Sequence, residues 1–417
     1  MLWSKKQRTY SAIDIGTTKV ITLVCQVSSD GLKILATGYS QSEGMQKGLV
    51  IDPNAVKNSI RSSVKQAEFA LGRQIPPAYI GVTGAHLYCT NADGAISNNL
   101  KIFSESDVDS LLKSTGPSSL PGKQIVQIIP RSFLVDGSER VSDPVGLKGS
   151  RLSVESHVVV GDSEPLEVLA RAVRSAGVEI KGMVLEHLAS AEAVLTKSEK
   201  DSGVVLVDIG GGTSDMAVYR NGLLWYTHAL PVAGQHFTSD IAAGLGIIPS
   251  IAEATKLANG SAITEGVETD ASIEVETGLG GHTRSVSQLV LNKLIRDRAT
   301  ELARMIMHKL AETGLKRLPA GGIVLTGGSS ALPGLVDIVA EQSKSSVRVG
   351  VPSSALGLPG EYERPSYSTS IGLLLWALQK KHAGTFVPAI PISQKMAWHA
   401  RRIAARLEME QPEEIKV

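Results

Sequence analysis

The sequence predicts an α/β protein made of two related lobes. The main sign is an internal repeat, because residues 11–20 and 206–215 each hold an apolar run, then Asp-Ile-Gly, a threonine and a second β-rich run. Each copy reads as a strand, a tight turn and another strand. The length of 417 residues also exceeds what one compact core usually holds. The wide separation of the two copies therefore favours two lobes of related architecture.

The first lobe is expected to begin with strands near residues 9–16, 18–28 and 32–43. A helix follows them, since Asp52 can cap it and Pro53 suits its first turn. Helical spacing places four apolar side chains of this helix on one face, namely Val56, Ile60, Val64 and Ala67. Residues 79–82 predict another strand. We assign residues 1–83 and 163–202 to the core of this lobe.

Residues 84–162 have the pattern of a unit inserted into the first lobe. We expect a strand at 94–102 and a helix at 106–112. After a loop rich in glycine, proline and serine, further strands are expected at 125–129, 132–136 and 151–160. A helix at 165–176 then returns the chain to the core.

The second lobe is assigned to residues 203–380. It contains Asn221-Gly222, a strong hairpin signal. A strand is expected at 322–326, a polar and irregular or strand-like stretch at 259–283, and helices near 234–244, 249–258, 286–313, 333–342 and 367–380. Residues 381–393 read as a linker, and residues 394–417 as a short amphipathic helix with a tail.

Two turns carry the residue types that grip a polyphosphate. Between Asp14 and Lys19, a hairpin without bulky side chains lets backbone N–H groups, threonine hydroxyls and the lysine approach phosphate oxygens. After Asp208, three consecutive glycines weaken a strand by entropy unless another group must come close. An aspartate at the end of each leading strand can hold Mg²⁺ through water. Facing each other, the turns would clamp a polyphosphate, whereas either one alone could be an ordinary β-turn.

A third turn, Gly327-Gly328-Ser329-Ser330, follows an apolar strand and precedes a helix. Such a turn lets a flat base lie against the backbone, with helix N–H groups nearby. Many α/β folds have a Gly-Gly turn at this place, so it does not identify a nucleotide site by itself. The sequence holds neither a G-x-x-x-x-G-K-[ST] string nor a G-x-G-x-x-G after a strand, which excludes the Walker A and Rossmann loops.

The order of these motifs resembles that of the actin, Hsp70 and sugar-kinase superfamily, and within it the FtsA family. Val184–Val194 is similar to the connecting helix of FtsA proteins, and Pro231–Ile241 to their next signature. Asp143–Leu152, with Asp136-Gly137 before it, resembles the inserted subdomain called 1C. The resemblance implies an actin-like two-lobed fold with duplicated ribonuclease-H-like subdomains and a 1C insertion.

The resemblance also implies ATP and Mg²⁺ as ligands and assigns site residues by position. Glu186 and Asp208 would orient water or metal, and Asp14 and Asp208 would hold Mg²⁺ through water. Glu253 and Lys256 share one helix face and would contact the adenosine, although alone they read as a solvated pair. The full nucleotide-contacting set is Asp14, Gly16, Thr17, Thr18, Lys19, Gly210, Gly211, Gly212, Thr213, Asp215, Gly234, Glu253, Lys256, Gly327, Gly328 and Ser329.

Two residues depart from the family pattern near these positions. His187 stands where proline is usual, and Ala233 stands where glycine is usual. Neither change removes a phosphate ligand. We interpret His187 as a tolerated backbone change, and the alternative is a catalytic histidine beside Glu186.

FtsA proteins typically end in an amphipathic membrane-binding helix, and this chain has a candidate. An apolar stripe of Met396, Ile403 and Leu407 is flanked by three arginines, Arg401, Arg402 and Arg406. Cationic flanks suit an anionic membrane surface. The stripe is narrow, however, and four glutamates from Glu408 onward oppose such binding. The alternative is a helix that docks on protein, or a segment that stays disordered.

The resemblance implies an ATP-binding cytoskeletal adaptor of cell division. Such a protein polymerises into a filament, binds the tubulin-like protein FtsZ and other division proteins, and lies on the inner face of the cell membrane at the division septum. ATP hydrolysis would be slow at most. The alternatives are a pilus-assembly ATPase of the same type and a small-molecule kinase, for which no second-substrate motif is readable.

The composition and charge of the chain limit its possible partners and its location in the cell. The formal net charge is only +1, so bulk charge gives no reason to expect nucleic acid as a partner. Neither a secretory signal nor an apolar run of about 20 residues is visible. We therefore expect a cytoplasmic protein, peripheral on the membrane if the C-terminal helix binds there.

Overall fold

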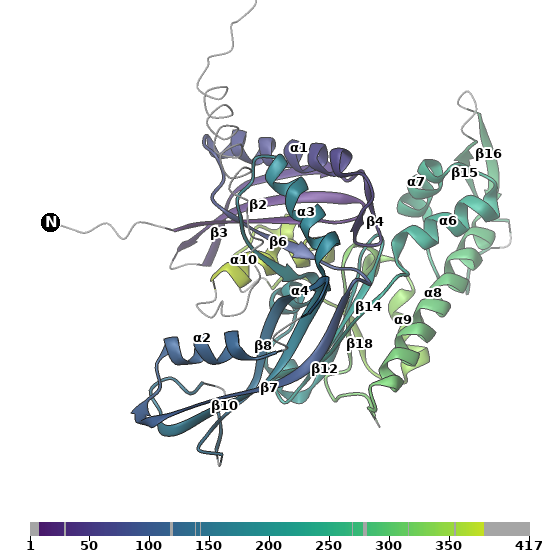
Figure 1. Cartoon of the computed structure of the whole chain (residues 1–417). Coiled ribbons are helices and arrows are strands. Elements are labelled where there is room, and N and C mark those ends of the chain that lie inside the picture. Colours follow the sequence, from purple (N-terminus) through teal and green to yellow (C-terminus); the bar gives the residue numbers. More distant parts are fainter. Residues whose placement is uncertain are drawn as a thin grey trace, which may run out of the picture. The chain divides into compact units, whose positions relative to one another are not determined.

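The structure is a computed structural model, and it describes residues 8–28, 31–116, 120–137, 139–141, 143–268, 270–277, 282–315, 317–353 and 356–378. This part of the chain forms two compact units (Figure 1). Unit 1 holds the chain as far as Ala193, the segment Ser353–Glu363 and the chain from Thr369 onward. Unit 2 holds Val194–Pro352 and Arg364–Ser368. Both units have an α/β core, so the predicted fold class is confirmed.

Unit 1 is built on a five-stranded sheet in the order β11-β6-β1-β2-β3. The strands β1 (Thr9–Ile15), β2 (Lys19–Ser28) and β3 (Gly31–Gln41) form an antiparallel meander close to the predicted ranges. On the other side β6 (Ala78–Val82) pairs parallel to β1, and β11 (Ile180–Leu185) pairs parallel to β6. The carboxyl ends of β1, β6 and β11 therefore share one edge of the sheet.

Helices cover this sheet (Figure 1). On one side α1 (Pro53–Leu71) packs against α3 (Ser163–Ser175). On the other side lie α4 (Glu186–Val194) and most of α10 (Ser368–Leu378). Asp52 caps α1 as predicted, and the four apolar positions expected on its inner face are buried. A short hairpin of β4 (Met45–Gln46) and β5 (Leu49–Val50) precedes α1.

The inserted unit is a four-stranded antiparallel sheet in the order β7-β10-β8-β9 with one helix packed on it. Its strands are β7 (Leu87–Ile102), β10 (Lys148–Asp162), β8 (Lys123–Val135) and β9 (Glu139–Val141), and its helix is α2 (Glu105–Ser114). Sheet and helix share a hydrophobic core that includes Phe103, Leu111, Leu112, Ile128, Phe133, Leu152, Val154 and Val158.

The prediction of two separate strands at 125–129 and 132–136 is wrong, because β8 continues through Pro130. Proline lacks the N–H that a central strand needs and is found at edges and irregularities of sheets. Pro130 pairs with Ser156 at a point where the register between β8 and β10 shifts. The irregularity accommodates the missing donor, so the strand bends there instead of ending.

Unit 2 is built on a second five-stranded sheet, in the order β14-β13-β12-β17-β18. The strands β12 (Val204–Ile209), β13 (Ser214–Arg220) and β14 (Leu223–Leu230) form an antiparallel meander. Parallel to β12 follow β17 (Ile323–Thr326) and β18 (Val347–Val349). Asn221 and Gly222 both have positive φ, of 54° and 77°, so the predicted hairpin turn is confirmed.

Four longer helices accompany this sheet, and all begin and end within two residues of the predicted ranges. They are α6 (Gly234–Leu245), α7 (Pro249–Asn259), α8 (Gln288–Glu312) and α9 (Leu335–Ser343). A short helix, α5 (Lys197–Ser202), precedes β12. The polar stretch before α8 contains a hairpin of β15 (Ser272–Glu276) and β16 (Thr283–Ser287). The fourth, α9, begins two residues later than predicted, after Gly334 in a left-handed conformation.

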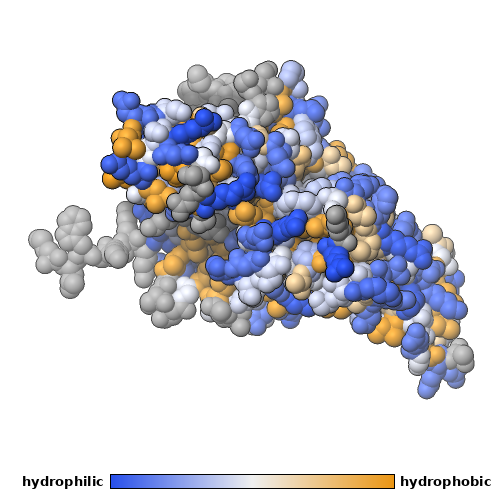
Figure 2. Space-filling view, turned by 90° about the horizontal axis from the view of Figure 1, so that it is seen from below, coloured by the Kyte–Doolittle hydropathy of each residue, from blue (hydrophilic) through white to orange (hydrophobic). Residues whose placement is uncertain are grey.

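Among the described residues, no single helix is long and apolar enough to cross a membrane. The helices α6 and α7 reach the required length and apolarity only as a pair bent by 107°, and they supply Phe237, Ile241, Leu245 and Ala252 to the core of unit 2. Hydrophilic and hydrophobic residues are interspersed on the face drawn in Figure 2. The predicted linker and C-terminal helix, with Met396, Arg401, Arg402, Ile403, Arg406 and Leu407, lie outside the described residues.

Candidate functional site

The first predicted phosphate turn joins β1 to β2 in unit 1. It is a tight hairpin, closed by a hydrogen bond of 3.0 Å from Gly16 N to Lys19 O. An added Cβ at Gly16 would lie 3.2 Å from that same carbonyl oxygen, so the turn leaves little room for a side chain. Thr18 is exposed, while Thr17 and Lys19 are half-buried. Backbone donors and hydroxyls are thus accessible at the end of the strand.

Asp14, the acidic residue of this turn, is a buried carboxylate with only 6% of its surface exposed. Burial raises the pKa of Asp14, while the charge of Lys19 and a hydrogen bond from Ser370 act in the opposite direction. The Ser370 hydroxyl donates to Oδ2 at 2.8 Å from the first turn of α10. A carboxylate held out of water in this way favours a cationic partner, since its desolvation is only partly offset by protein groups.

Glu186 begins α4 directly after β11, at the same edge of the unit 1 sheet as Asp14. The strand between them is β6, so β1 and β11 are separated by two strand spacings, or about 10 Å. An added Cβ on Gly81 of β6 would come 2.8 Å from Glu186 Cγ. An isolated glycine inside a strand marks such a close approach, and here it gives the glutamate side chain its space.

The second predicted phosphate turn joins β12 to β13 in unit 2. Gly210 N donates to Thr213 O at 2.9 Å, and the Thr213 hydroxyl donates to Asp215 Oδ2 at 2.9 Å. Asp208 and Asp215 stand opposite each other on paired strands and are 6% and 3% exposed. The turn therefore carries two buried carboxylates next to a glycine backbone.

The glycines of the second and third turns lie against the start of α6. Gly234 N and Gln235 N donate to Gly210 O and Gly211 O at 3.1 and 2.7 Å. The Ser329 hydroxyl donates to Gly210 O at 2.8 Å. An added Cβ at Gly234 would collide with that hydroxyl, and one at Gly327 would collide with Asp208 Oδ1 and Ile209 O. These contacts leave room for backbone alone.

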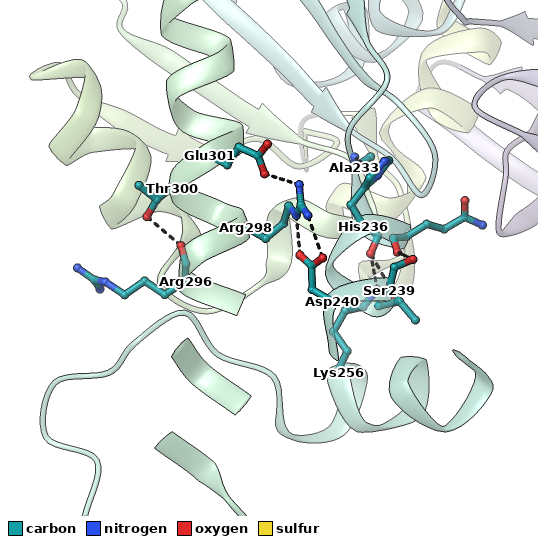
Figure 3. A network of polar contacts seen from close by, with 12 residues as sticks. Ala233, His236, Ser239, Asp240, Lys256, Arg296, Arg298, Thr300 and Glu301 are labelled. Atoms are coloured by element: carbon teal, nitrogen blue, oxygen red, sulfur yellow. Dashed lines mark hydrogen bonds and ion pairs between the residues drawn. The ribbon is translucent and has the colours of Figure 1, made fainter. Parts of the chain in front are cut away.

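Lys256 anchors α7 to the start of α6 (Figure 3). Its Nζ donates to Gly234 O at 3.1 Å, to Thr238 Oγ1 at 2.9 Å and to Glu253 Oε2 at 2.7 Å. Thr238 in turn donates to Glu253. The Lys256 side chain is 11% exposed and that of Glu253 is 38% exposed, so the solvated-pair interpretation is wrong for the lysine.

An ion-pair network holds α6 against α8 on the same unit (Figure 3). Arg298 donates from Nε to Asp240 Oδ2 at 2.6 Å and from a terminal nitrogen to Asp240 Oδ1 at 2.8 Å, and it also pairs with Glu301. The hydrogen bonds to Asp240 raise the pKa of Arg298. A bidentate arginine fixes geometry as well as charge, so α6 presents Gly234 from a defined position.

The structure shows the surroundings of Ala233 and His187, the two residues that depart from the family pattern. Ala233 adopts an extended backbone with φ −163°, which any residue can take, and its N–H donates to His236 Nδ1 at 3.2 Å. His187 is 3% exposed, and neither ring nitrogen has a hydrogen-bond partner among the described residues. Burial, with a smaller effect from His157, lowers the pKa of His187 to about 3. An enclosed imidazole with so low a pKa is a weak base, which favours the interpretation of His187 as a tolerated backbone change.

The sequence matches known proteins over most of its length. A relative from Pseudomonas aeruginosa described as "Cell division protein FtsA" is 34% identical over 374 residues, which cover 89% of this chain and 90% of the relative. A Bacillus subtilis protein with the same description is 34% identical over 371 residues, covering 88% and 83%. This chain belongs to the FtsA family of cell division proteins. The family described as "Cell division protein FtsA" matches residues 205–372, and the "SHS2 domain inserted in FTSA" matches residues 84–160.

Solved structures resemble the FtsA-family chain at much lower identity. A chain of the PilM-PilN type IV pilus biogenesis complex has a TM-score of 0.64 at 16% identity, covering 89% of this chain and 98% of its own length. MreB5 of Spiroplasma citri bound to ADP has a TM-score of 0.51 at 14% identity, covering 88% and 96%. Identities this low show the fold alone, which is actin-like as predicted. The pilus alternative is set aside, because the sequence places the chain with FtsA.

The predicted site residues of this FtsA-family protein fall into two groups, one in each unit. Unit 1 gathers Asp14, Gly16, Thr17, Thr18, Lys19 and Glu186 at one sheet edge. Unit 2 gathers Asp208, Gly210, Gly211, Gly212, Thr213, Asp215, Gly234, Glu253, Lys256, Gly327, Gly328 and Ser329 around the start of α6. We call these groups the first and second half-sites.

Three residues that support the half-sites were missed by sequence reasoning. Gly81 had a usable signal, since a glycine inside an apolar strand suggests a close approach. Thr238 lies one helical turn after Gly234 and donates to its carbonyl at 3.2 Å, which helical spacing could have suggested. Ser370 had no local signal, because it meets Asp14 from a position 356 residues away.

The two half-sites have the chemistry that a magnesium nucleotide needs. Asp14 is a buried carboxylate whose pKa is raised by burial, and a hydrated cation would favour its charged form. The glycines at 210, 234 and 327 hold backbone where any Cβ would be crowded, which suits close approach of phosphate and base. No three His, Cys, Asp or Glu side chains gather as a metal cage in the described part of the chain, and Mg²⁺ bound with phosphate does not require one.

Proposed function

We propose that this FtsA-family protein binds ATP with Mg²⁺ and acts as an actin-like adaptor in cell division. The observation that carries the proposal is the pair of half-sites, each with a buried aspartate at the end of a strand followed by a glycine turn. MreB5 of Spiroplasma citri, a solved protein of similar fold, is described as bound to ADP and in another structure to AMPPNP. Duplicated turns of this kind suit a ligand with several phosphates.

Each residue has a role under this proposal. Asp14 and Asp208 accept hydrogen bonds from water around Mg²⁺, and Lys19 offers positive charge to phosphate oxygens. Gly16 N and Gly210 N close the two turns, so the backbone N–H groups of Thr17 and Thr18 and of Gly211–Thr213 line the phosphates, with threonine hydroxyls as added donors. Glu253 and Lys256 lie beside the adenosine, and Gly327, Gly328 and Ser329 flank the base. Bound Mg²⁺ neutralises phosphate charge.

Hydrolysis is slow under this proposal. Glu186 is the candidate for orienting a water molecule, with Asp208 as the second acidic group. His187 contributes no proton transfer, because its ring is enclosed and a pKa lowered to about 3 makes it a weak base. The nucleotide therefore acts mainly as a ligand that favours one conformation over another through differential affinity.

We infer that the partners are FtsZ, further copies of this chain in a filament, an anionic membrane surface and other division proteins. The location is cytoplasmic, on the inner face of the membrane at the division septum. Support for the membrane comes from the sequence of the C-terminal segment, where Met396, Ile403 and Leu407 lie with Arg401, Arg402 and Arg406. Each basic residue near an anionic surface contributes about 1 kcal/mol.

Co-sedimentation tests the proposal directly. The purified protein is mixed with Mg-ATP and liposomes that contain anionic lipid, and the pellet is compared with that of a chain ending at Lys381. We expect ATP-dependent pelleting with liposomes for the full chain and none for the truncated one. Neutral liposomes and ADP serve as matched controls, because they remove the charge attraction and the γ-phosphate separately.

The same experiment separates the competing functions. Pelleting of both chains without liposomes would support the filament and would point to a protein partner for residues 394–417. Absence of pelleting, together with turnover of ATP on a small acceptor molecule, would contradict the adaptor and support a kinase.

A further inference from the structure

Asp14 depends on a residue from the far end of the described chain. Its carboxylate accepts one hydrogen bond from another described side chain, the 2.8 Å bond from Ser370 Oγ to Oδ2. Ser370 is wholly buried and Asp14 is 6% exposed, so water competes little for this bond. Hydrogen bonds to a charged acceptor in such a setting are shorter and stronger than those between neutral groups.

Ser370 lies on α10, which packs tightly against α4. One residue earlier, Thr369 Oγ1 lies 3.1 Å from the hydroxyl of Ser190 on α4. Two residues later, an added Cβ at Gly372 would collide with the Ala189 carbonyl, so the backbones of α10 and α4 are in close contact. Because α10 is held on both sides of Ser370, the serine has little freedom to follow a shift of the carboxylate.

We propose that Ser370 is a positioning residue for the divalent cation that accompanies the nucleotide. It fixes Oδ2 of Asp14 and thereby orients Oδ1 toward the hydration shell of the cation. The inference rests on the proposed binding of Mg-ATP. It adds a residue of α10, a helix outside the three glycine turns, to the machinery that holds the metal.

The expected signature is a loss of affinity that depends on the metal. Without the serine, the carboxylate rotates and loses its one side-chain donor, so the water-mediated hold on the cation weakens. Metal-free ATP makes no use of that hold. A merely structural role for Ser370 would instead weaken both forms of the nucleotide, or lower the stability of the protein without nucleotide.

The experiment measures ATP affinity of the full chain by calorimetry, once with millimolar Mg²⁺ and once with EDTA. For Ser370→Ala we expect about tenfold weaker binding with Mg²⁺ and less than about twofold change in EDTA. Ser370→Thr keeps the hydroxyl and is expected to restore most of the affinity. Ser190→Ala is the matched control, because it removes another fully buried serine hydroxyl that contacts α10 without touching Asp14.

The outcomes are distinguishable. Wild-type protein that binds no Mg-ATP overturns the proposed function and this inference together. Wild-type binding that Ser370→Ala leaves unchanged, or weakens equally with Mg²⁺ and with EDTA, overturns the inference alone. If Ser370→Ala does not fold, Ser370→Cys supplies the same comparison, since a thiol of similar shape is only a weak donor.

Discussion

The turn after β1 and the turn after β12 share Asp-Ile-Gly and a following threonine, yet they are held in different ways. In the first half-site the carboxylate is the fixed part, since Asp14 is buried and bonded to Ser370. The turn itself is exposed at Thr18; Gly16 N donates to Lys19 O across it, and Thr18 O accepts from Ser42 N at 3.1 Å. In the second half-site the turn is fixed, because Gly210 O accepts from both Gly234 N and the Ser329 hydroxyl.

This difference indicates how one motif can serve two purposes. An exposed turn beside an anchored aspartate can contact a ligand while the carboxylate stays in place. A turn crowded by neighbouring backbone offers a rigid surface and tolerates almost no side chain. Substitutions that remove charge should therefore affect the first half-site most. Substitutions that add side-chain volume should affect the second half-site most.

The largest effect is expected from adding one methyl group to the second half-site. Gly327 has φ +82°, and a Cβ there collides with Asp208 Oδ1 and Ile209 O. Gly327→Ala should lower the free energy of unfolding by about 3 kcal/mol or more, because both strain and overlap act. Denaturant unfolding measures this. Gly16→Ala, whose Cβ would lie 3.2 Å from Lys19 O, should cost about 1 kcal/mol or less, and equal losses would contradict the comparison.

Removing the charge of Asp14 in the first half-site should change ligand affinity strongly and the free energy of unfolding little. Asp14→Asn keeps the shape but deletes a carboxylate whose pKa is raised by burial. We expect affinity for Mg-ATP to fall about 100-fold, or about 3 kcal/mol, while the free energy of unfolding stays equal or rises by up to about 1 kcal/mol. Calorimetric titration and urea unfolding measure the two quantities. A clear loss of stability would show that the charge supports the fold instead of the ligand.

A smaller effect is expected from removing the hydrogen bonds by which Lys256 joins α7 to the start of α6. Lys256→Met removes hydrogen bonds to Gly234 O, Thr238 and Glu253, at a site where the lysine side chain is 11% exposed. We expect unfolding to become easier by about 2 kcal/mol and ATP affinity to fall about tenfold. Lys197→Met is the control, since its pair with Asp201 is a surface contact in which the lysine side chain is 91% exposed, and it should contribute less than about 0.5 kcal/mol.

The smallest effect concerns pH and the enclosed imidazole beside Glu186. The folded-state pKa of His187 is lowered from 6.5 to about 3, so the unfolded state takes up a proton first as the pH falls. The contribution to stability is complete above pH 6.5 and is lost progressively toward pH 3. Wild type should lose about 1 kcal/mol more than His187→Leu between pH 7 and 5.5.

Unfolding curves at the two pH values measure this difference. Equal pH dependence in wild type and His187→Leu would mean that the imidazole is solvated.

Most secondary structure was predictable because its signals are local. The cap at Asp52 and the Asn221-Gly222 turn act within a few residues, and both predictions are confirmed. The break expected at Pro130 was wrong, since a register shift against β10 accommodates the proline. Short strands such as β11 and β18 had no prediction of their own, because they are defined by pairing with strands far away in the sequence.

By itself the sequence determined the duplicated Asp-Ile-Gly turns, the inserted unit and the family resemblance, because these depend on residue order alone. Only the tertiary structure decided which groups surround each turn. It brought Gly81 beside Glu186, Ser329 onto Gly210 O, and Ser370 onto Asp14 across 356 residues. Such contacts arise from the packing of whole strands and helices, and packing depends on every side chain between the layers, so no short stretch of sequence contains it.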